Sequence, residues 1–256
     1  MTNIGLSLLL MLLTTQVIAA PQIVIIIDDL GNQSHTAKRV MDLPGPVVCS
    51  ILPQRPFTKK IARWAHEQQK EVLVHLPMQS IQNSALGPGG LELSMDEHQF
   101  RQTIIENLDS VPFNIGLNNH MGSLMTQHPG NMMWLMQTLK TYPDKVFLDS
   151  RTTHKTVAHD IAIEFDIPSV SRDIFLDDLV EIEAIQSQFD LLIEIAKKKG
   201  QAIAIGHPYP ETLEVLNENI PLLSAQGVEL VSLKTLMQGN GLDSEMDISI
   251  AAGMSE

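Results

Sequence analysis

Short runs of β-branched and other apolar residues alternate along the chain with longer segments in which apolar residues recur every three or four positions. The runs predict strands at 23–27, 47–51, 71–75, 113–117, 145–149, 168–172, 202–206 and 228–232. The helical spacing predicts helices near 57–69, 96–109, 129–141, 179–199 and 210–217. Because strands and helices alternate with no linker between two halves, the pattern predicts an α/β fold with a parallel sheet, either doubly wound or closed as a βα barrel.

The two ends of the chain depart from this pattern. Residues 1–20, MTNIGLSLLLMLLTTQVIAA, carry no charged side chain and contain an apolar run that ends in small residues. They predict a signal peptide cleaved after Ala19, which would leave a periplasmic or secreted protein with no stable membrane span; an uncleaved anchor helix is the alternative. Residues 239–256 hold four acidic and no basic residues, which predicts a disordered acidic tail after a single domain at 21–238.

Net charge narrows the choice of partners. The formal charge is −13, and all of it belongs to the chain after the uncharged leader. Phosphates repel such a surface, so nucleic acid and anionic lipid are excluded as expected partners. Cys49 is the single cysteine, so no intramolecular disulfide can form.

Polar residues cluster at the carboxyl ends of the predicted strands, where α/β folds place their binding and catalytic groups. They are Asp28, Asp29, His75, Asn118, Asn119, His120, Asp149, Arg151, Arg172, Asp173 and His207. Each also has a structural interpretation on its own: an Asp can cap a helix, a His can be buried in the core, and the Arg residues can pair with neighbouring Asp residues. The convergence of so many on one edge favours a functional site.

Two adjacent carboxylates repel each other unless a cation or a shared proton relieves them. Asp28 and Asp29 are such a pair, and His75 and His120 follow other strands of the same sheet. Zinc takes carboxylate oxygen and imidazole nitrogen as ligands and activates a water, while a spare carboxylate and imidazole can act as base and acid. The residues therefore predict a site for a divalent metal, with zinc as the favoured ion.

Six segments in this order resemble the divergent polysaccharide deacetylases, relatives of the carbohydrate esterases. They are IVIIIDDLG, VLVHLPMQ, LNNHMGSLMT, FLDSRTT, SRDIFLDD and AIAIGHPYPETL. The resemblance covers about 21–238 and implies a distorted (β/α) barrel of the NodB type, with parallel strands and outer helices.

The resemblance also implies roles for single residues. In the ordinary deacetylases the first Asp of the Asp-Asp pair is the base and the second is a metal ligand, which assigns these roles to Asp28 and Asp29. The next motif has two metal-binding histidines; His75 matches the first, whereas Gln79 stands at the second position, so His120 is predicted to replace it. The late histidine motif implies that His207 is the acid.

The remaining predicted site residues lie within the same six segments. Asp173 is the candidate for orienting His207, and Arg151 is the candidate for the catalytic arginine of the family. The candidate substrate contacts are Asn119, Asp149 and Tyr209, of which Tyr209 is the one aromatic residue well placed beside His207.

Two functions remain open from the sequence. The first is an exported metal-dependent hydrolase that removes an acyl group, such as acetyl, from an N-acylated sugar or envelope glycan. The second is a catalytically inactive envelope module that keeps the deacetylase fold and binds a carbohydrate or a protein partner. Gln79 in place of a histidine favours the second, while retention of both Asp28 and His207 favours the first.

Overall fold

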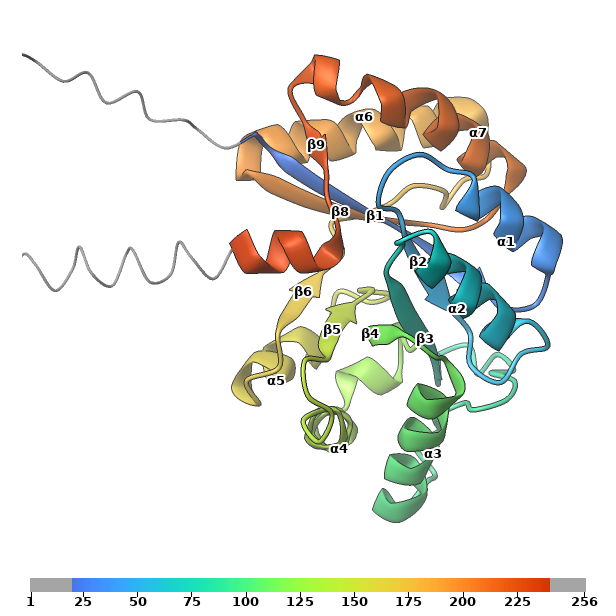
Figure 1. Ribbon diagram of the computed structural model, residues 1–256. Helices are drawn as coiled ribbons and strands as arrows, with labels where there is room; N and C mark the ends of the chain where they lie inside the picture. The colour runs from blue at the N-terminus through green and yellow to red at the C-terminus, as the bar shows by residue number, and fades with distance from the viewer. Residues whose placement is uncertain (1–19, 240–256) are drawn as a thin grey trace, which may run out of the picture.

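The computed structural model describes residues 20–239 (Figure 1). The predicted signal peptide and acidic tail lie outside these residues. The described strands are β1 (Gln22–Leu30), β2 (Val48–Ile51), β3 (Val72–Met78), β4 (Asn114–Met121), β5 (Val146–Asp149), β6 (Ser169–Ser171), β7 (Ile174–Phe175), β8 (Gln201–Gly206) and β9 (Glu229–Leu230). None of the helices in residues 20–239 is long and apolar enough to cross a membrane.

All strand pairs are parallel, in the order β6-β5-β4-β3-β2-β1-β8-β7, and β9 pairs with the start of β1. The strand predicted at 168–172 matches β6, which pairs with β5, whereas β7, which follows at 174–175 and pairs with β8, was not predicted. Residues 169–175 thus connect the two edge regions of the curled sheet. The predicted distorted βα barrel is confirmed as a curled, incompletely closed sheet of parallel strands.

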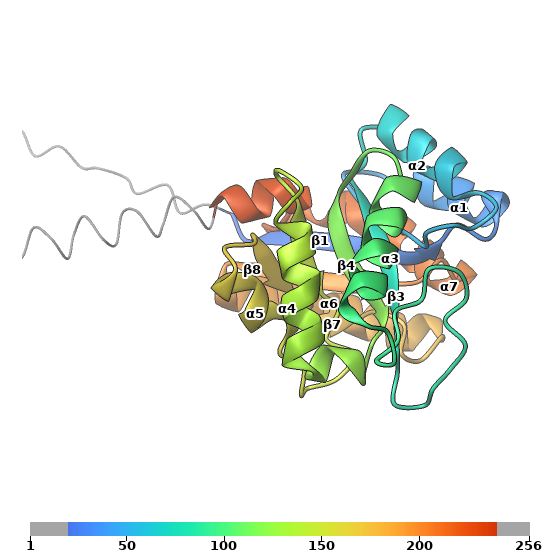
Figure 2. The same ribbon diagram turned by 90° about the horizontal axis from the view of Figure 1, so that it is seen from below.

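Helices connect the strands and lie on the outer side of the curled sheet (Figures 1 and 2). They are α1 (Ser34–Met41), α2 (Thr58–Glu67), α3 (Glu97–Ser110), α4 (Pro129–Leu139), α5 (Ala158–Glu164), α6 (Ile182–Lys199) and α7 (Pro210–Asn219). The five predicted helices are all present. The helices α1 and α5 were not predicted, because they span only 8 and 7 residues, too short for an apolar period to repeat.

Alternation along the strands divides the core into two parts. On β1, Ile23, Ile25 and Ile27 pack with the helices, whereas Val24 and Ile26 face a second, smaller cluster inside the curl. Successive side chains of a strand point to opposite faces, so both faces of β1 are covered and its apolar run is continuous. The inward-facing positions lead directly to the site.

Candidate active site

The central polar residues continue the inward-facing series of apolar residues. On β1 the series Val24, Ile26 is followed by Asp28, and on β3 Leu73 is followed by His75. Both polar residues are about 2% exposed. Burying a charged or polar group is costly unless it is paired, so Asp28 and His75 must find hydrogen-bond or ion-pair partners inside the protein. The strands also extend beyond the predicted apolar runs, and His75 lies within β3 rather than at its end.

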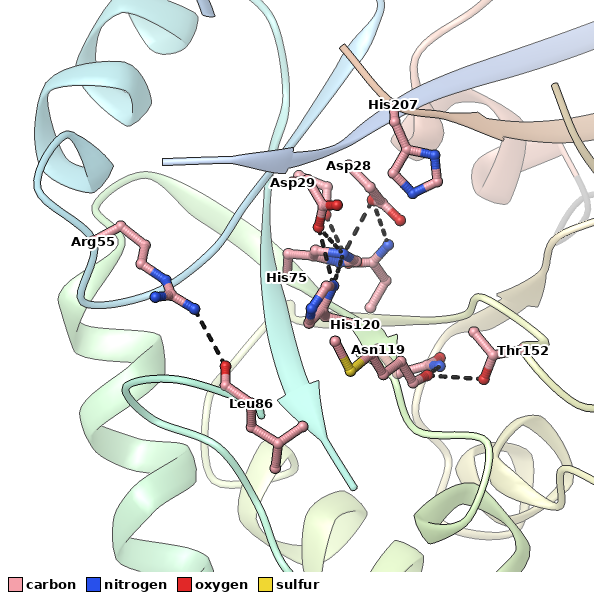
Figure 3. Close-up of polar contacts among 12 residues, drawn as sticks. Asp28, Asp29, Arg55, His75, Leu86, Asn119, His120, Thr152 and His207 are labelled. Atoms are coloured by element: carbon pink, nitrogen blue, oxygen red, sulfur yellow. Dashed lines mark hydrogen bonds and ion pairs between the residues drawn. The ribbon is translucent and has the colours of Figure 1, made fainter. Parts of the chain in front are cut away.

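Asp29 would point to the opposite face of β1 if the strand were regular. Its backbone has φ +60°, and the register between β1 and β2 shifts between Ile27 and Leu30. This irregularity brings Asp29 to the same side as Asp28, toward His75 and His120 (Figure 3). A left-handed conformation at a non-glycine residue is uncommon, but Asp tolerates it better than most.

Three side-chain atoms from β1, β3 and β4 form a compact triangle. Asp29 Oδ1 lies 3.0 Å from His120 Nδ1 and 3.3 Å from His75 Nε2. The two ring nitrogens are 3.0 Å apart. Ligands placed tetrahedrally around zinc at about 2.0–2.1 Å have neighbouring ligand atoms roughly 3.3 Å apart. The triangle therefore has the size that one face of such a site requires.

The buried oxygen in this triangle is not satisfied by the protein. Asp29 Oδ1 accepts no hydrogen bond from residues 20–239, although two ring nitrogens are near it. Burial alone would raise the pKa of Asp29, but the adjacent imidazoles of His120 and His75 lower it well below its usual range. An ionised, unsatisfied oxygen beside two ring nitrogens fits a cation-binding site.

Asn118 connects the metal-ligand candidates to Asp28. Its Nδ2 donates to Asp28 Oδ1 at 2.9 Å, and its Oδ1 accepts from His75 Nδ1 at 2.9 Å and from Ser50 Oγ at 2.7 Å. Because the amide oxygen can only accept, His75 carries its proton on Nδ1 and directs the lone pair of Nε2 into the triangle. Burial alone would lower the pKa of His75, but the charges of Asp28 and Asp29 raise it.

A second imidazole–carboxylate pair stands beside the triangle. His207 Nδ1 lies 2.8 Å from Asp177 Oδ1, and Asp177 Oδ2 accepts from the His207 backbone N–H at 2.6 Å and from Thr212 Oγ1 at 2.7 Å. Burial alone would lower the pKa of His207, but the hydrogen bond and charge of Asp177 raise it to about 9. His207 is therefore protonated at neutral pH.

The prediction that Asp173 orients His207 is corrected by this geometry. Asp173 Oδ1 pairs with Lys199 Nζ at 2.9 Å, and its Oδ2 accepts from the backbone N–H of Ile203. The sequence contained a signal for Asp177, because it follows the apolar residues 174–176. Treating 168–172 as the complete strand placed the strand end at the wrong Asp.

Two of the predicted substrate contacts are buried and bonded within the protein. Asn119, 1% exposed, donates to the Met121 carbonyl and accepts from the Ser150 N–H. Asp149, 0% exposed, accepts from the Arg151 N–H and from Thr156 Oγ1. These bonds shape the loops after β4 and β5, so we correct the interpretation of both residues from substrate contact to loop support.

The predicted arginine and tyrosine are accessible. Arg151 is exposed at the start of the loop after β5, with φ +46°. Tyr209 is 42% exposed, and its ring centroid lies 5.8 Å from that of His207. Arg172 instead supports the loop: it donates to the carbonyls of Ser150 and Arg151 and lies over the Phe175 ring.

A pocket of about 460 Å³ adjoins the triangle. Asp29, His207 and Tyr209 line one side, and residues of α1 and the turn before it line the other. No role was predicted for the α1 residues, because this short helix was itself not predicted.

Comparison with known sequences identifies the family. Residues 25–237 match the sequence pattern of the family described as divergent polysaccharide deacetylase. This chain belongs to that family. It is 34% identical to the uncharacterized protein YibQ of Escherichia coli over 226 residues, which cover 88% of this chain and 70% of YibQ. It is 37% identical to an uncharacterized protein of Haemophilus influenzae over 218 residues, 85% of this chain and 77% of the relative.

Among solved structures, an uncharacterized protein of Agrobacterium tumefaciens shares the fold. The two superpose with a TM-score of 0.82 at 19% sequence identity, covering 87% of this chain and 91% of the other. This likeness extends to the fold alone.

Membership in the divergent polysaccharide deacetylases makes the position of Gln79 informative. Its Oε1 accepts from the backbone N–H of Leu93 at 2.8 Å, and its Nε2 donates to Asn83 Oδ1 at 3.3 Å. Gln79 thus supports the connection between β3 and α3, whereas His120 lies in the triangle.

Proposed function

We propose that this deacetylase-family chain is a metal-dependent hydrolase that removes an acyl group from an N-acylated sugar. The observation that carries the proposal is the triangle of Asp29, His75 and His120, flanked by the separately held side chains of Asp28 and His207 (Figure 3). The first three would hold a divalent ion, with zinc favoured by the mixture of one carboxylate and two imidazoles. Such an ion would polarise the substrate carbonyl and stabilise negative charge that develops on its oxygen.

Asp28 is suited to act as the base. The Asn118 amide holds Asp28 Oδ1 at 2.9 Å, and the carboxylate lies 3.6 Å from His75 Nδ1 and beside Asp29 (Figure 3). A base in this position would take a proton from the water that attacks the amide carbon. Asp28 is therefore held in place by Asn118 but is not one of the three candidate metal ligands.

His207 is suited to act as the acid. It is protonated at neutral pH, because the hydrogen bond and charge of Asp177 raise its pKa to about 9. Asp177 bonds to Nδ1, so Nε2 remains able to donate its proton. When the C–N bond breaks, the departing nitrogen takes the electron pair and requires a proton, which His207 would supply. Water thus gives its hydroxyl to the acyl group, and the sugar leaves as an amine.

Metal content and acetate release measured together test this function. Purified protein should contain one divalent ion per chain and should release acetate from N-acetylated sugars, and Asp28→Asn should retain the ion but lose most of the activity. A wild-type protein that binds the metal and the sugar but releases no acetate would support the alternative, an inactive binding module. This alternative is supported by Gln79, which stands where the ordinary deacetylases have the second metal-binding histidine.

We further propose that the protein is exported and acts in the cell envelope. The uncharged apolar segment at 1–20 supports export. Mass spectrometry of the envelope fraction should find a chain beginning at Ala20 or Pro21. An intact segment 1–20 in that fraction would exclude cleavage.

A further inference from the structure

The pocket beside the triangle extends away from the reacting groups toward α1. Asp29 and His207 line the pocket at the reacting groups, and Arg39 lines it from α1. A sugar whose acyl group reaches the triangle would therefore place its remaining substituents against α1. This wall decides which substituents are favoured.

One face of α1 forms the wall. His35, Thr36 and Arg39 line the pocket, whereas Ala37 and Val40 are buried against the core. Residues three and four positions apart share a face of a helix, so His35 and Arg39 lie one turn, or about 6 Å, apart along the wall. The pocket is thus bordered by hydrogen-bonding groups and one permanent cation.

Arg39 is free to bind a ligand. Its guanidinium forms neither an ion pair nor a hydrogen bond with residues 20–239, the part of the chain that the structure describes. Asp29 is the one acidic side chain among the residues that line the pocket, and it belongs to the triangle. The chain carries a net charge of −13, so an unpaired guanidinium gives this pocket a positive charge that the protein as a whole lacks.

Tyr209 indicates how the sugar would lie. Its partly exposed ring borders the same pocket and is 5.8 Å from His207, centroid to centroid. An aromatic ring offers a flat apolar face to a sugar, and this ring lines the pocket together with His207 and the α1 residues. A sugar stacked there can direct one substituent to the triangle and another to Arg39.

We propose that the pocket recognises an anionic substituent, carboxylate or phosphate, on the N-acylated sugar, and that Arg39 is the residue that binds it. The inference rests on the proposed function and adds the substrate class to it. A guanidinium offers paired donors that match either oxyanion, and Arg39 requires no rearrangement of an existing ion pair to make these bonds.

Three probes with the same ring and acetamido group separate the alternatives: N-acetylglucosamine, N-acetylmuramic acid and N-acetylglucosamine 6-phosphate. The wild-type kcat/KM should be at least about 10-fold higher for one or both anionic sugars than for the neutral one, the size of one charge-assisted hydrogen bond. Arg39→Gln should remove this preference, so that the ratio of kcat/KM for the better anionic probe to kcat/KM for N-acetylglucosamine falls to about one. The better anionic probe identifies the group as carboxylate or phosphate.

Lys38→Gln is the matched control, because it removes an adjacent positive charge from the same helix turn without lining the pocket. It should preserve the preference for the anionic probe. An equal loss in Lys38→Gln and Arg39→Gln, or an unchanged preference in Arg39→Gln, would overturn the proposal.

A binding measurement separates this inference from the proposed function. Calorimetry with Asp28→Asn should detect tighter binding of the anionic probe than of N-acetylglucosamine, and the additional change Arg39→Gln should abolish the difference. If no probe is hydrolysed by the wild type but this difference in binding is present, the hydrolase proposal fails and the anion site stands. If all three are hydrolysed without preference, the anion site fails and the hydrolase stands.

Discussion

Two imidazole–carboxylate groups lie side by side at the same end of the barrel, and they are satisfied in opposite ways. In the first, Asp29 Oδ1 has two ring nitrogens within 3.3 Å but accepts no hydrogen bond from the described residues. In the second, the carboxylate of Asp177 accepts three hydrogen bonds, two from the ring and backbone of His207 and one from Thr212. The first group leaves a buried acceptor that fits a cation, whereas the second holds the proton of His207. Both groups combine Asp with His, and they differ in the number of hydrogen-bond donors around the carboxylate.

The largest effect should come from removing a member of the first group. We expect His120→Ala to lose stoichiometric metal and to lower kcat/KM by at least about 1000-fold, because metal ions supply several kcal/mol of transition-state stabilisation. Gln79→Ala should retain the metal, because Gln79 bonds to a loop instead. Elemental analysis and acetate release check both variants, and full metal content in His120→Ala would remove His120 from the ligand set.

Changes to the two proton-transfer residues should separate activity from metal content. Asp28→Asn and His207→Ala should each lower the rate by about 10²- to 10⁴-fold, the usual contribution of a general base or acid. Both should keep the metal, because neither side chain is in the triangle. Loss of the ion together with activity would make the changed residue a ligand, and unchanged activity would exclude it from the mechanism.

The pH profile tests the second group directly. The pKa of His207 is raised to about 9, so the acid form is present below this pH and is lost above it, and kcat/KM should fall as pH rises through about 9. Asp177→Asn removes the charge that raises this pKa, so the descending limb should move toward the ordinary value of 6.5. At pH 8 the acid form would then decrease by roughly 30-fold.

Asp173→Asn is the control for this pH experiment. Asp173 pairs with Lys199 and should leave the descending limb in place. A limb that moves in Asp173→Asn but not in Asp177→Asn would contradict the assignment of the partner of His207.

The smallest effect is expected at the residue that joins Asp28 to the first group. Asn118→Ala removes the acceptor that fixes the proton of His75 on Nδ1, so metal affinity should fall on the order of 10-fold. Titration of the metal-free protein with zinc measures this change. Thermal unfolding of the metal-free form provides the reference for any general destabilisation, and an affinity equal to wild type would show that Asn118 does not support the ligand.

Sequence reasoning located the triangle because β-branched runs marked the strands and parallel strands collect their carboxyl ends at one edge. It did not foresee the left-handed backbone at Asp29, which no periodic pattern encodes. It also placed Asn119 and Asp149 against substrate, because a strand-end polar residue that bonds its own loop has the same sequence signature as one that faces a ligand. The helix α1 was not predicted because its apolar positions cover only 8 residues, and the wall of the pocket was missed with it.

The position of β1 in the sheet has a consequence for folding. Gln22 pairs with Gln201 and Glu229, so the strand that bears both carboxylates is completed by partners that are synthesised last. Contacts this distant in sequence make folding slow, and domains are made from the N-terminus onward. Until β8 arrives, β1 presents an apolar edge of five consecutive β-branched residues, a template for pairing with other chains. The strand that carries Asp28 and Asp29 therefore keeps one edge unpaired until the C-terminal strands have been made.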